Sequence, residues 1–170
     1  DTVEFLCDQV DLDRLVITSI RAKEASEALL RVLMLKVPPD KFAPRVLAVL
    51  NQRLLRKLCE TCREAYAPTP QVLQQLRIPA GKVEAFYRPP QQREEVCSDC
   101  GGIGYRGRAA IFELLVMNDA VKGVLAKTPK LELLRQAARK AGVRGLQEEG
   151  ILLVAKGVTS LQELMRVLKE

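Results

Sequence analysis

The feature that most constrains this chain is a pair of C-x-x-C sequences set far apart. Cys59-Glu-Thr-Cys62 and Cys97-Ser-Asp-Cys100 are separated by the 34 residues 63–96. A C-x-x-C turn directs two sulfurs toward one centre, and two such turns complete the tetrahedron that Zn²⁺ accepts from four thiolates. Four protein ligands leave no open position on the metal. The spacing therefore predicts a structural Zn²⁺ site rather than a catalytic one.

Other interpretations of these cysteines stay open. An iron site of the rubredoxin kind uses the same four ligands. Disulfides suit a secreted chain, but the acidic opening residues lack the basic segment of an export signal, and Cys7 would be left over. A redox C-x-x-C needs no second copy. Cys7 itself is interpreted as a small, buried apolar residue.

Composition excludes several kinds of catalyst. The 170 residues include no histidine, which removes the Ser-His-Asp triad, the Cys-His pair and every histidine-containing metal site. Apolar residues make up 48% and charged residues 28%, as in ordinary folded domains. No apolar run approaches the length of about 18 residues that a membrane-spanning helix needs. We expect a folded α/β chain without membrane insertion.

The net charge of +6 is unevenly distributed. Residues 41–63 carry six basic side chains against Glu60 alone, whereas acidic side chains predominate in residues 1–40. A basic stretch of this kind fits a nucleic-acid surface, and a zinc-knuckle nucleic-acid-binding module is the alternative function. It also fits the offset of thiolate charge by the basic residues near the cysteines, namely Arg56, Lys57, Arg63, Arg106 and Arg108. Aromatic residues at 4% and the absence of tryptophan count against base stacking.

The apolar pattern also predicts secondary structure. Thr69 and Pro70 fit the N-cap and first position of a short helix, and Gly142 and Gly157 fit positions just after helices. Ser160 and Glu163 form a capping-box pattern. The sequence predicts strands at 15–20 and 109–117, and helices at 22–36, 41–58, 70–77, 119–126, 130–141, 145–156 and 160–169.

Three stretches of sequence resemble the secretion ATPases of type II secretion and type IV pilus assembly. They are Cys97-Ser-Asp-Cys-Gly-Gly-Ile-Gly-Tyr-Arg-Gly-Arg-Ala-Ala-Ile-Phe-Glu-Leu-Leu115, Asn51-Gln-Arg-Leu-Leu-Arg-Lys-Leu-Cys-Glu-Thr-Cys62, and Gly157-Val-Thr-Ser-Leu-Gln-Glu163 with Arg166-Val167. Residues 1–36 also fit, with Asp1-Thr2 just past the family's Walker B region and Arg31 at the arginine of the following helix. The resemblance covers nearly the whole chain.

The resemblance implies a longer parent protein. That parent would be a hexameric bacterial ATP-driven motor, cytoplasmic and peripheral at the inner membrane, working with inner-membrane platform and secretion-system proteins. In this expectation residues 1–58 end a RecA-like ATPase core, residues 59–108 form a zinc subdomain held by Cys59, Cys62, Cys97 and Cys100, and residues 109–170 form a strand and a helical region. The fold class is then α/β, a C-terminal remnant of a P-loop NTPase domain with a small zinc-binding insertion.

Two departures from the family pattern limit what the chain can do. The phosphate-binding sequence G-x-x-x-x-G-K-[ST] is absent, so we expect no ATP hydrolysis by this chain alone and no catalytic residue within it. ATP and Mg²⁺ would bind only in the parent. The family's histidine box, S-T-L-H-T-N, is Thr18-Ser-Ile-Arg-Ala-Lys23 here. Arg21 replaces the histidine, cannot accept a proton, and is the candidate contact to a nucleotide phosphate.

Overall fold

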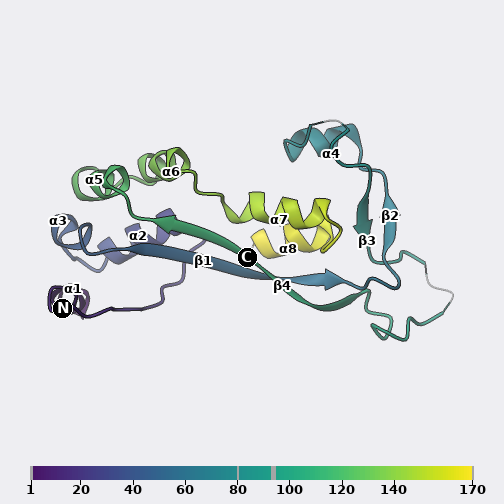
Figure 1. The fold of residues 1–170 in the computed structure, drawn as a ribbon, viewed down its shortest axis with the longest axis horizontal. Coiled ribbons are helices and arrows are strands. Elements are labelled where there is room, and N and C mark those ends of the chain that lie inside the picture. Colours follow the sequence, from purple (N-terminus) through teal and green to yellow (C-terminus); the bar gives the residue numbers. More distant parts are fainter. Residues whose placement is uncertain (1, 80, 93–94, 170) are drawn as a thin grey trace. The chain divides into compact units, whose positions relative to one another are not determined.

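The computed structural model contains both helices and small sheets, which confirms the α/β class (Figure 1). The structure describes residues 2–79, 81–92 and 95–169. Its elements are α1 (Thr2–Val10), α2 (Ala25–Leu33), α3 (Pro39–Phe42), β1 (Ala48–Leu58), β2 (Glu64–Tyr66), α4 (Pro70–Gln75), β3 (Phe86–Arg88), β4 (Tyr105–Val116), α5 (Asp119–Lys127), α6 (Leu131–Lys140), α7 (Leu146–Ala155) and α8 (Leu161–Lys169). None of the helices in the described part of the chain has the length and apolar character needed to cross a membrane.

The strands form two sheets of two strands each. The long strands β1 and β4 pair with each other, and Figure 1 draws their arrows in opposite directions. The short strands β2 and β3 are antiparallel, with Glu64 opposite Arg88 and Tyr66 opposite Phe86. Both short strands lie in the sequence between the two cysteine pairs.

The chain packs as two compact units, each made of two separate stretches. Unit 1 comprises Asp1–Asn51 and Phe112–Gly145, and unit 2 comprises Gln52–Ile111 and Leu146–Glu170. Both β1 and β4 therefore contribute residues to each unit. The three domains expected from the sequence, 1–58, 59–108 and 109–170, divide the chain by composition, and that division remains a prediction.

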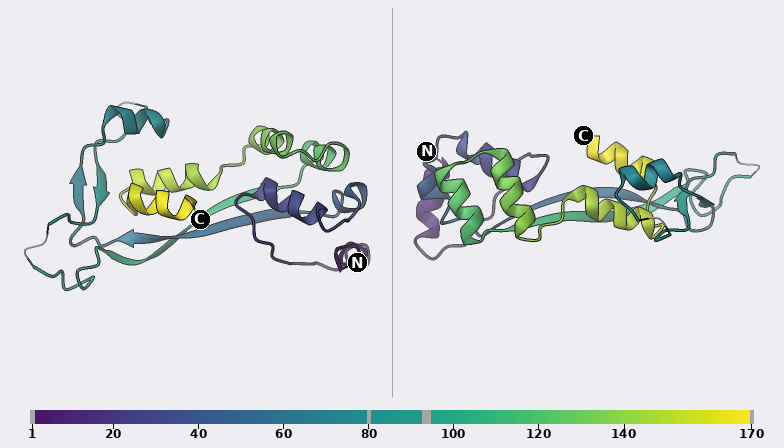
Figure 2. Two further views of the ribbon diagram at one scale, coloured as in Figure 1. Left: turned by 180° about the vertical axis from the view of Figure 1, so that it is seen from behind. Right: turned by 90° about the horizontal axis from the view of Figure 1, so that it is seen from above.

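Each unit has its own hydrophobic core. In unit 1, α2, α5 and α6 bury side chains around Leu115 of β4, and Leu125 and Leu134 are fully enclosed. In unit 2, Leu55 and Phe86 are enclosed together with residues of α7 and α8. These two helices lie side by side in Figures 1 and 2. Burial of apolar surface is the main stabilising term in both units.

Several sequence predictions are confirmed. The structure contains α2 within 22–36, α4 within 70–77, β4 over most of 109–117, and the four C-terminal helices α5 to α8. Thr69 caps α4 by accepting a hydrogen bond from the N–H of Val72. Gly142 and Gly157 have positive φ angles of 81° and 68° after α6 and α7. Cys7 is a buried residue of α1, as predicted.

The predicted helix at 41–58 is wrong. Only the short α3 is helical there, and residues Ala48–Leu58 form β1. Apolar residues stand on both faces of this strand, so their positions also matched the spacing of a helix. The pairing partner, β4, lies about fifty residues further along the chain, beyond the reach of a local pattern.

The predicted buried strand at 15–20 is also wrong. No strand covers these described residues, and the side chains of Leu15 and Ile17 are 74% and 86% exposed. A strand buried on both faces needs neighbours that pair with it and helices that cover it. The described residues supply neither to this segment.

Candidate metal centre

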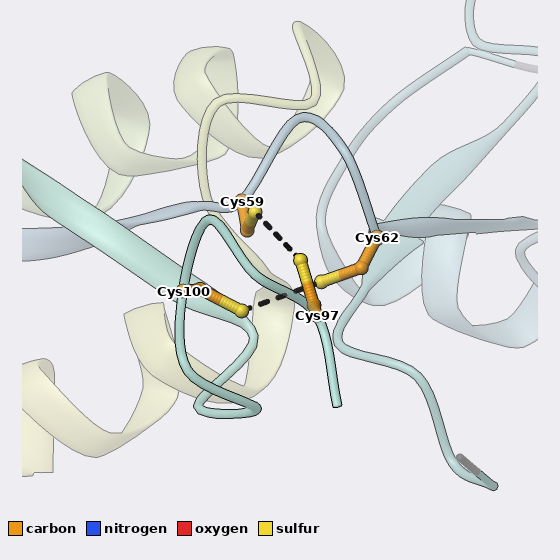
Figure 3. A group of neighbouring side chains, drawn as sticks. All are labelled: Cys59, Cys62, Cys97 and Cys100. Atoms are coloured by element: carbon orange, nitrogen blue, oxygen red, sulfur yellow. Dashed lines mark hydrogen bonds between the residues drawn. The ribbon is translucent and has the colours of Figure 1, made fainter. Parts of the chain in front are cut away.

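The four predicted ligands come together in unit 2 (Figure 3). Cys59 directly follows β1 and Cys62 lies in the turn before β2, while Cys97 and Cys100 lie in the turn before β4. The paired strands β1 and β4 thus bring two cysteine pairs that are far apart in sequence to the same place. All four Sγ atoms lie within 4.8 Å of one another.

The sulfur distances fit one tetrahedral ion. The Sγ atoms of Cys59 and Cys97 are 3.9 Å apart, and those of Cys62 and Cys100 are 3.6 Å apart. A disulfide bond is about 2.05 Å long, and all five cysteines are free. A regular tetrahedron with metal–sulfur bonds of about 2.3 Å has edges of about 3.8 Å. The donor set therefore fits a four-thiolate metal site.

Backbone hydrogen bonds hold the two cysteine turns against each other. The N–H of Gly104 donates to Cys100 Sγ at 3.2 Å, and the N–H of Cys59 donates to the carbonyl of Gly104 at 3.0 Å. Gly104 has a φ of 81°, a conformation that a glycine adopts without steric penalty. One residue therefore connects both halves of the site.

Polar side chains add a second link between the turns. Thr61, from the first turn, donates a hydrogen bond to Asp99 of the second. Arg106 of β4 forms an ion pair with the same carboxylate at 3.3 Å. The hydrogen bond between Thr61 and Asp99 links the two turns, and the ion pair to Arg106 ties the second turn to β4.

The pKa values of Cys62 and Cys100 indicate why a bound cation would be favourable at this site. Burial, followed by the sulfurs of Cys100, Cys59 and Cys97, raises the pKa of Cys62 to about 12. Hydrogen bonding from the N–H of Gly104 lowers the pKa of Cys100 to about 7. Several thiolates held this close repel each other, and a dication offsets that repulsion.

Part of the basic stretch has partners elsewhere in unit 2. Arg56 pairs with Glu163 of α8 at 2.6 Å. Arg63 donates to the carbonyl of Gly157 at 2.6 Å, and its guanidinium lies 4.6 Å from the centre of the Tyr87 ring. Arg56 and Arg63 thus have partners other than the sulfurs, and the offset of thiolate charge by basic residues near the cysteines stays a prediction.

Other basic residues of this stretch pair with the acidic α1 region. Lys41 contacts Asp8 at 2.9 Å. Arg45 binds both carboxylate oxygens of Asp11, at 2.9 and 2.5 Å. The charge asymmetry between residues 1–40 and 41–63 is thus partly neutralised inside unit 1. These ion pairs count against the interpretation of the basic stretch as a surface for nucleic acid.

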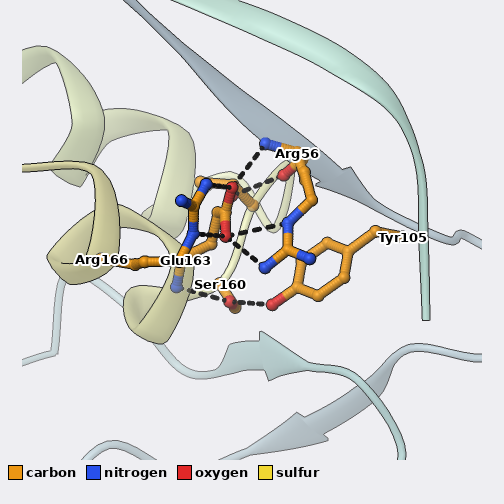
Figure 4. A network of polar contacts seen from close by, with 6 residues as sticks. Arg56, Tyr105, Ser160, Glu163 and Arg166 are labelled. Atoms are coloured by element: carbon orange, nitrogen blue, oxygen red, sulfur yellow. Dashed lines mark hydrogen bonds and ion pairs between the residues drawn. The ribbon is translucent and has the colours of Figure 1, made fainter. Parts of the chain in front are cut away.

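Glu163 is the centre of a polar network that goes beyond the capping box predicted from the sequence (Figure 4). Its side chain is 1% exposed and accepts hydrogen bonds from Arg56 Nε at 3.0 Å and from Arg166 at 2.9 Å. Burial opposes ionisation, but these bonds outweigh it and lower the pKa of Glu163 to about 2. The capping box is only half realised: Ser160 Oγ accepts the N–H of Glu163, while the carboxylate binds the arginines.

The remaining contacts of this network tie β1 and β4 to α8. Tyr105 of β4 and Ser160 share a hydrogen bond of 2.7 Å, and the guanidinium of Arg56 lies 4.3 Å from the centre of the Tyr105 ring. Thr159 donates to the carbonyl of Arg56 at 2.8 Å. Tyr105 is therefore a packing residue, and these contacts hold β1 and β4 against the start of α8 within unit 2.

Arg21 is not part of the cysteine cluster. It lies in unit 1, exposed, in the segment that precedes α2. Glu113 was not predicted from the sequence; it is buried in β4 and accepts a hydrogen bond from the N–H of Ala25, the first residue of α2. A charged residue between the apolar Ile111 and Leu115, on the same face of a strand, was the available signal.

Comparison with known proteins agrees with the family resemblance of the sequence. The family model described as "Type II/IV secretion system protein" matches residues 1–166. Type IV pilus assembly ATPase PilB of Thermus thermophilus is 29% identical over 167 residues, 97% of this chain and 18% of that protein. Type II secretion system protein E of Aeromonas hydrophila is 35% identical over 158 residues, 92% of this chain and 30% of that protein.

A third relative shows the same coverage. Type II secretion system ATPase E of Vibrio cholerae is 31% identical over 156 residues, 92% of this chain and 30% of that protein. The chain thus spans less than a third of the length of these three relatives. It belongs to the type II/IV secretion system protein family.

Proposed function

We propose that this chain is the C-terminal part of a hexameric motor ATPase that drives type II secretion or type IV pilus assembly. The family match over residues 1–166 carries this proposal. The chain lacks the Walker A sequence, so ATP and Mg²⁺ would bind in the full-length protein and the chain would not hydrolyse ATP alone. That protein would act in the cytoplasm, at the inner membrane, with platform and secretion-system proteins.

The role proposed for the cysteine cluster is structural zinc binding. Cys59, Cys62, Cys97 and Cys100 would hold one Zn²⁺ and staple the segment between them, which would present a coupling surface to partners. The donor set supports this role, because four thiolates on d¹⁰ Zn²⁺ leave no open position for chemistry. The site lies where β1 ends and β4 begins, so a bound ion would hold these strand ends together.

Metal content of the purified, reduced chain tests the cysteine role. Plasma mass spectrometry is expected to find about one zinc per chain. One iron per chain, with the red colour of a ferric thiolate site, would replace zinc by a rubredoxin-like centre. A reduced, folded chain that binds neither metal would contradict the structural metal site.

Arg21 is proposed to contact a nucleotide phosphate in the full-length ATPase. Its guanidinium is always charged and offers paired donors to phosphate oxygens. Its exposure in the segment before α2 leaves it accessible to such a contact. Replacing Arg21 by alanine is expected to lower ATP hydrolysis by the full-length protein, whereas lysine should restore part of it. Unchanged hydrolysis in the alanine variant would contradict this role.

A further inference from the structure

Glu113 occupies a buried position that ordinarily holds an apolar residue. Side chains of β4 alternate from Ile111 onward, and Glu113 lies on the buried side between Ile111 and Leu115 with 9% of its surface exposed. Burying a carboxyl group is unfavourable unless hydrogen-bond donors meet it. Its partners therefore indicate why a glutamate stands here.

Two donors meet the same carboxyl oxygen of Glu113. The backbone N–H of Ala25 donates to Oε2 at 3.0 Å, and the side-chain amide of Asn51 donates to it at 3.2 Å. Ala25 is the first residue of α2, where the helix itself provides no acceptor for the N–H. Glu113 thus caps α2 from a strand 88 residues further along the chain, at the positive end of the helix dipole.

The residues just before α2 are held as well. The amide of Asn51 also donates to the carbonyl of Lys23 at 2.9 Å, and the N–H of Lys23 donates to Glu27 at 2.7 Å. Both backbone polar groups of Lys23 are therefore bound, one to β1 and the other to α2. Arg135 of α6 binds the carboxylate of Glu24 at 2.7 Å. The backbone of residues 23–25 is held by contacts to β1, β4 and α2, and the Glu24 side chain adds a contact to α6, all within unit 1.

Arg21 lies two residues before this fixed backbone. The Arg21 side chain is exposed, and the fixed backbone of residues 23–25 restricts the position of the Arg21 backbone from which that side chain extends. A charged group that must meet phosphate oxygens acts best when its place is set before the ligand arrives. Buried Glu113 and half-buried Asn51 supply such a support through their hydrogen bonds to Ala25 and Lys23.

We propose that Glu113 and Asn51 are positioning residues that set the place of Arg21 for contact with nucleotide phosphates. The inference rests on the proposed function, since it requires Arg21 to face a nucleotide in the full-length ATPase. Neither residue touches the nucleotide. Each acts through the backbone of residues 23–25.

Amide hydrogen exchange in the 170-residue chain tests the contacts themselves. In Glu113→Ala, exchange at Ala25 is expected to quicken by about tenfold or more, because the N–H loses its acceptor. Glu113→Gln retains an acceptor oxygen and should restore most of the protection. Glu148→Gln, an exposed glutamate on α7, is the matched control and should leave Ala25 unchanged. Unchanged exchange at Ala25 in Glu113→Ala would overturn the inference.

A double-variant comparison in the full-length protein tests the function. If Glu113 acts through Arg21, Glu113→Ala lowers kcat for ATP hydrolysis, and combining it with Arg21→Ala gives no further loss. Losses that multiply would overturn the inference but leave the role of Arg21 intact. If Arg21→Ala alone hydrolyses ATP at the normal rate, both the proposed role of Arg21 and this inference are overturned. The exchange experiment then still reports separately on the contact to Ala25.

Discussion

At the scale of single residues, Gly157 shows how closely unit 2 is packed after α7. Its φ of 68° is unfavourable for other residues, and a Cβ at this position would lie 2.6 Å from the Tyr87 ring. Arg63 stacks on the same ring and donates to the carbonyl of Gly157. The glycine therefore permits both a helix end and a close approach between α7 and the β2–β3 region.

Replacing Gly157 by alanine is expected to destabilise the chain by about 2–3 kcal/mol, from backbone strain together with the collision against Tyr87. Gly142→Ala is the matched control, because Gly142 has a φ of 81° after α6 but nothing within 4 Å of an added Cβ. It should cost about 1 kcal/mol. Denaturant titration measures both values, and equal losses would show that the Tyr87 ring simply moves aside.

Four of the five cysteines are predicted metal ligands, and Cys7 is not. Cys97→Ser should abolish metal binding and expose residues 63–96 to protease, because structural zinc contributes on the order of 10 kcal/mol to folding. Cys7→Ala removes a buried thiol that belongs to α1, outside the cluster, and should keep one metal per chain. Metal analysis and limited proteolysis check both variants. Unchanged protease resistance in Cys97→Ser would contradict a stapling role.

At the scale of elements, Glu163 links α8 to β1 through a charge that is almost fully enclosed. Its ordinary pKa of 4.5 falls to about 2 in the folded chain. A lowered folded pKa means that ionised Glu163 stabilises the fold above about pH 4.5, and that this contribution is lost as the pH falls toward 2. We expect this loss of stability in unit 2, because Glu163, Arg56 and Arg166 all lie there.

Comparison of the native chain with Glu163→Gln isolates this effect. At pH 7 the variant should be less stable by about 3 kcal/mol, the typical result of removing one partner from a buried ion pair. The difference should shrink steadily as the pH is lowered from 4.5 toward 2. Unfolding by urea at a series of pH values measures the difference. A difference independent of pH would show that hydrogen bonding, not charge, holds α8 to β1.

Local signals predicted the elements whose stabilising contacts are close in sequence. Thr69 and Pro70 marked α4, and the glycines after α6 and α7 marked where those helices end. The cysteine cluster was predictable because its ligand spacing is a chemical requirement. β1 was not, since its partner β4 is remote and its apolar residues, which stand on both faces of the strand, also fit the spacing of a helix. The role of Glu113 and the ion pair of Glu163 with Arg56 were not predictable for the same reason, because the partners come from distant segments.

At the scale of the whole chain, the division into two units predicts how the molecule responds to metal removal. All four cysteines belong to unit 2, and each unit has its own core. Treatment of the reduced chain with a strong chelator is expected to raise amide exchange around residues 59–66 and 97–104. Exchange in the helices α2, α5 and α6 of unit 1 should change little. Uniform loss of protection across both units would show that they fold as one.

Nucleotide chemistry gives a second prediction for the chain as a whole. The 170-residue chain should release no phosphate from ATP above the buffer rate, because it has no Walker A sequence to bind the phosphates. A phosphate-release assay with a full-length family member as positive control measures this. Hydrolysis that co-purifies with the folded chain, and persists in Arg21→Ala, would point to a nucleotide site of a different kind.

The cysteines lie directly after β1 and shortly before β4, and this position affects how the length of the loop between them can vary during evolution. A bound metal would close the loop between the cysteine pairs, and closing a flexible loop of twice the length costs only about 0.6 kcal/mol more in entropy. Insertions between Cys62 and Cys97 would therefore be tolerated where they leave Phe86 in its core. We expect such length changes in the turns between Cys62 and Cys97 rather than within β2, α4 or β3, because residues of these elements pack in the core of unit 2.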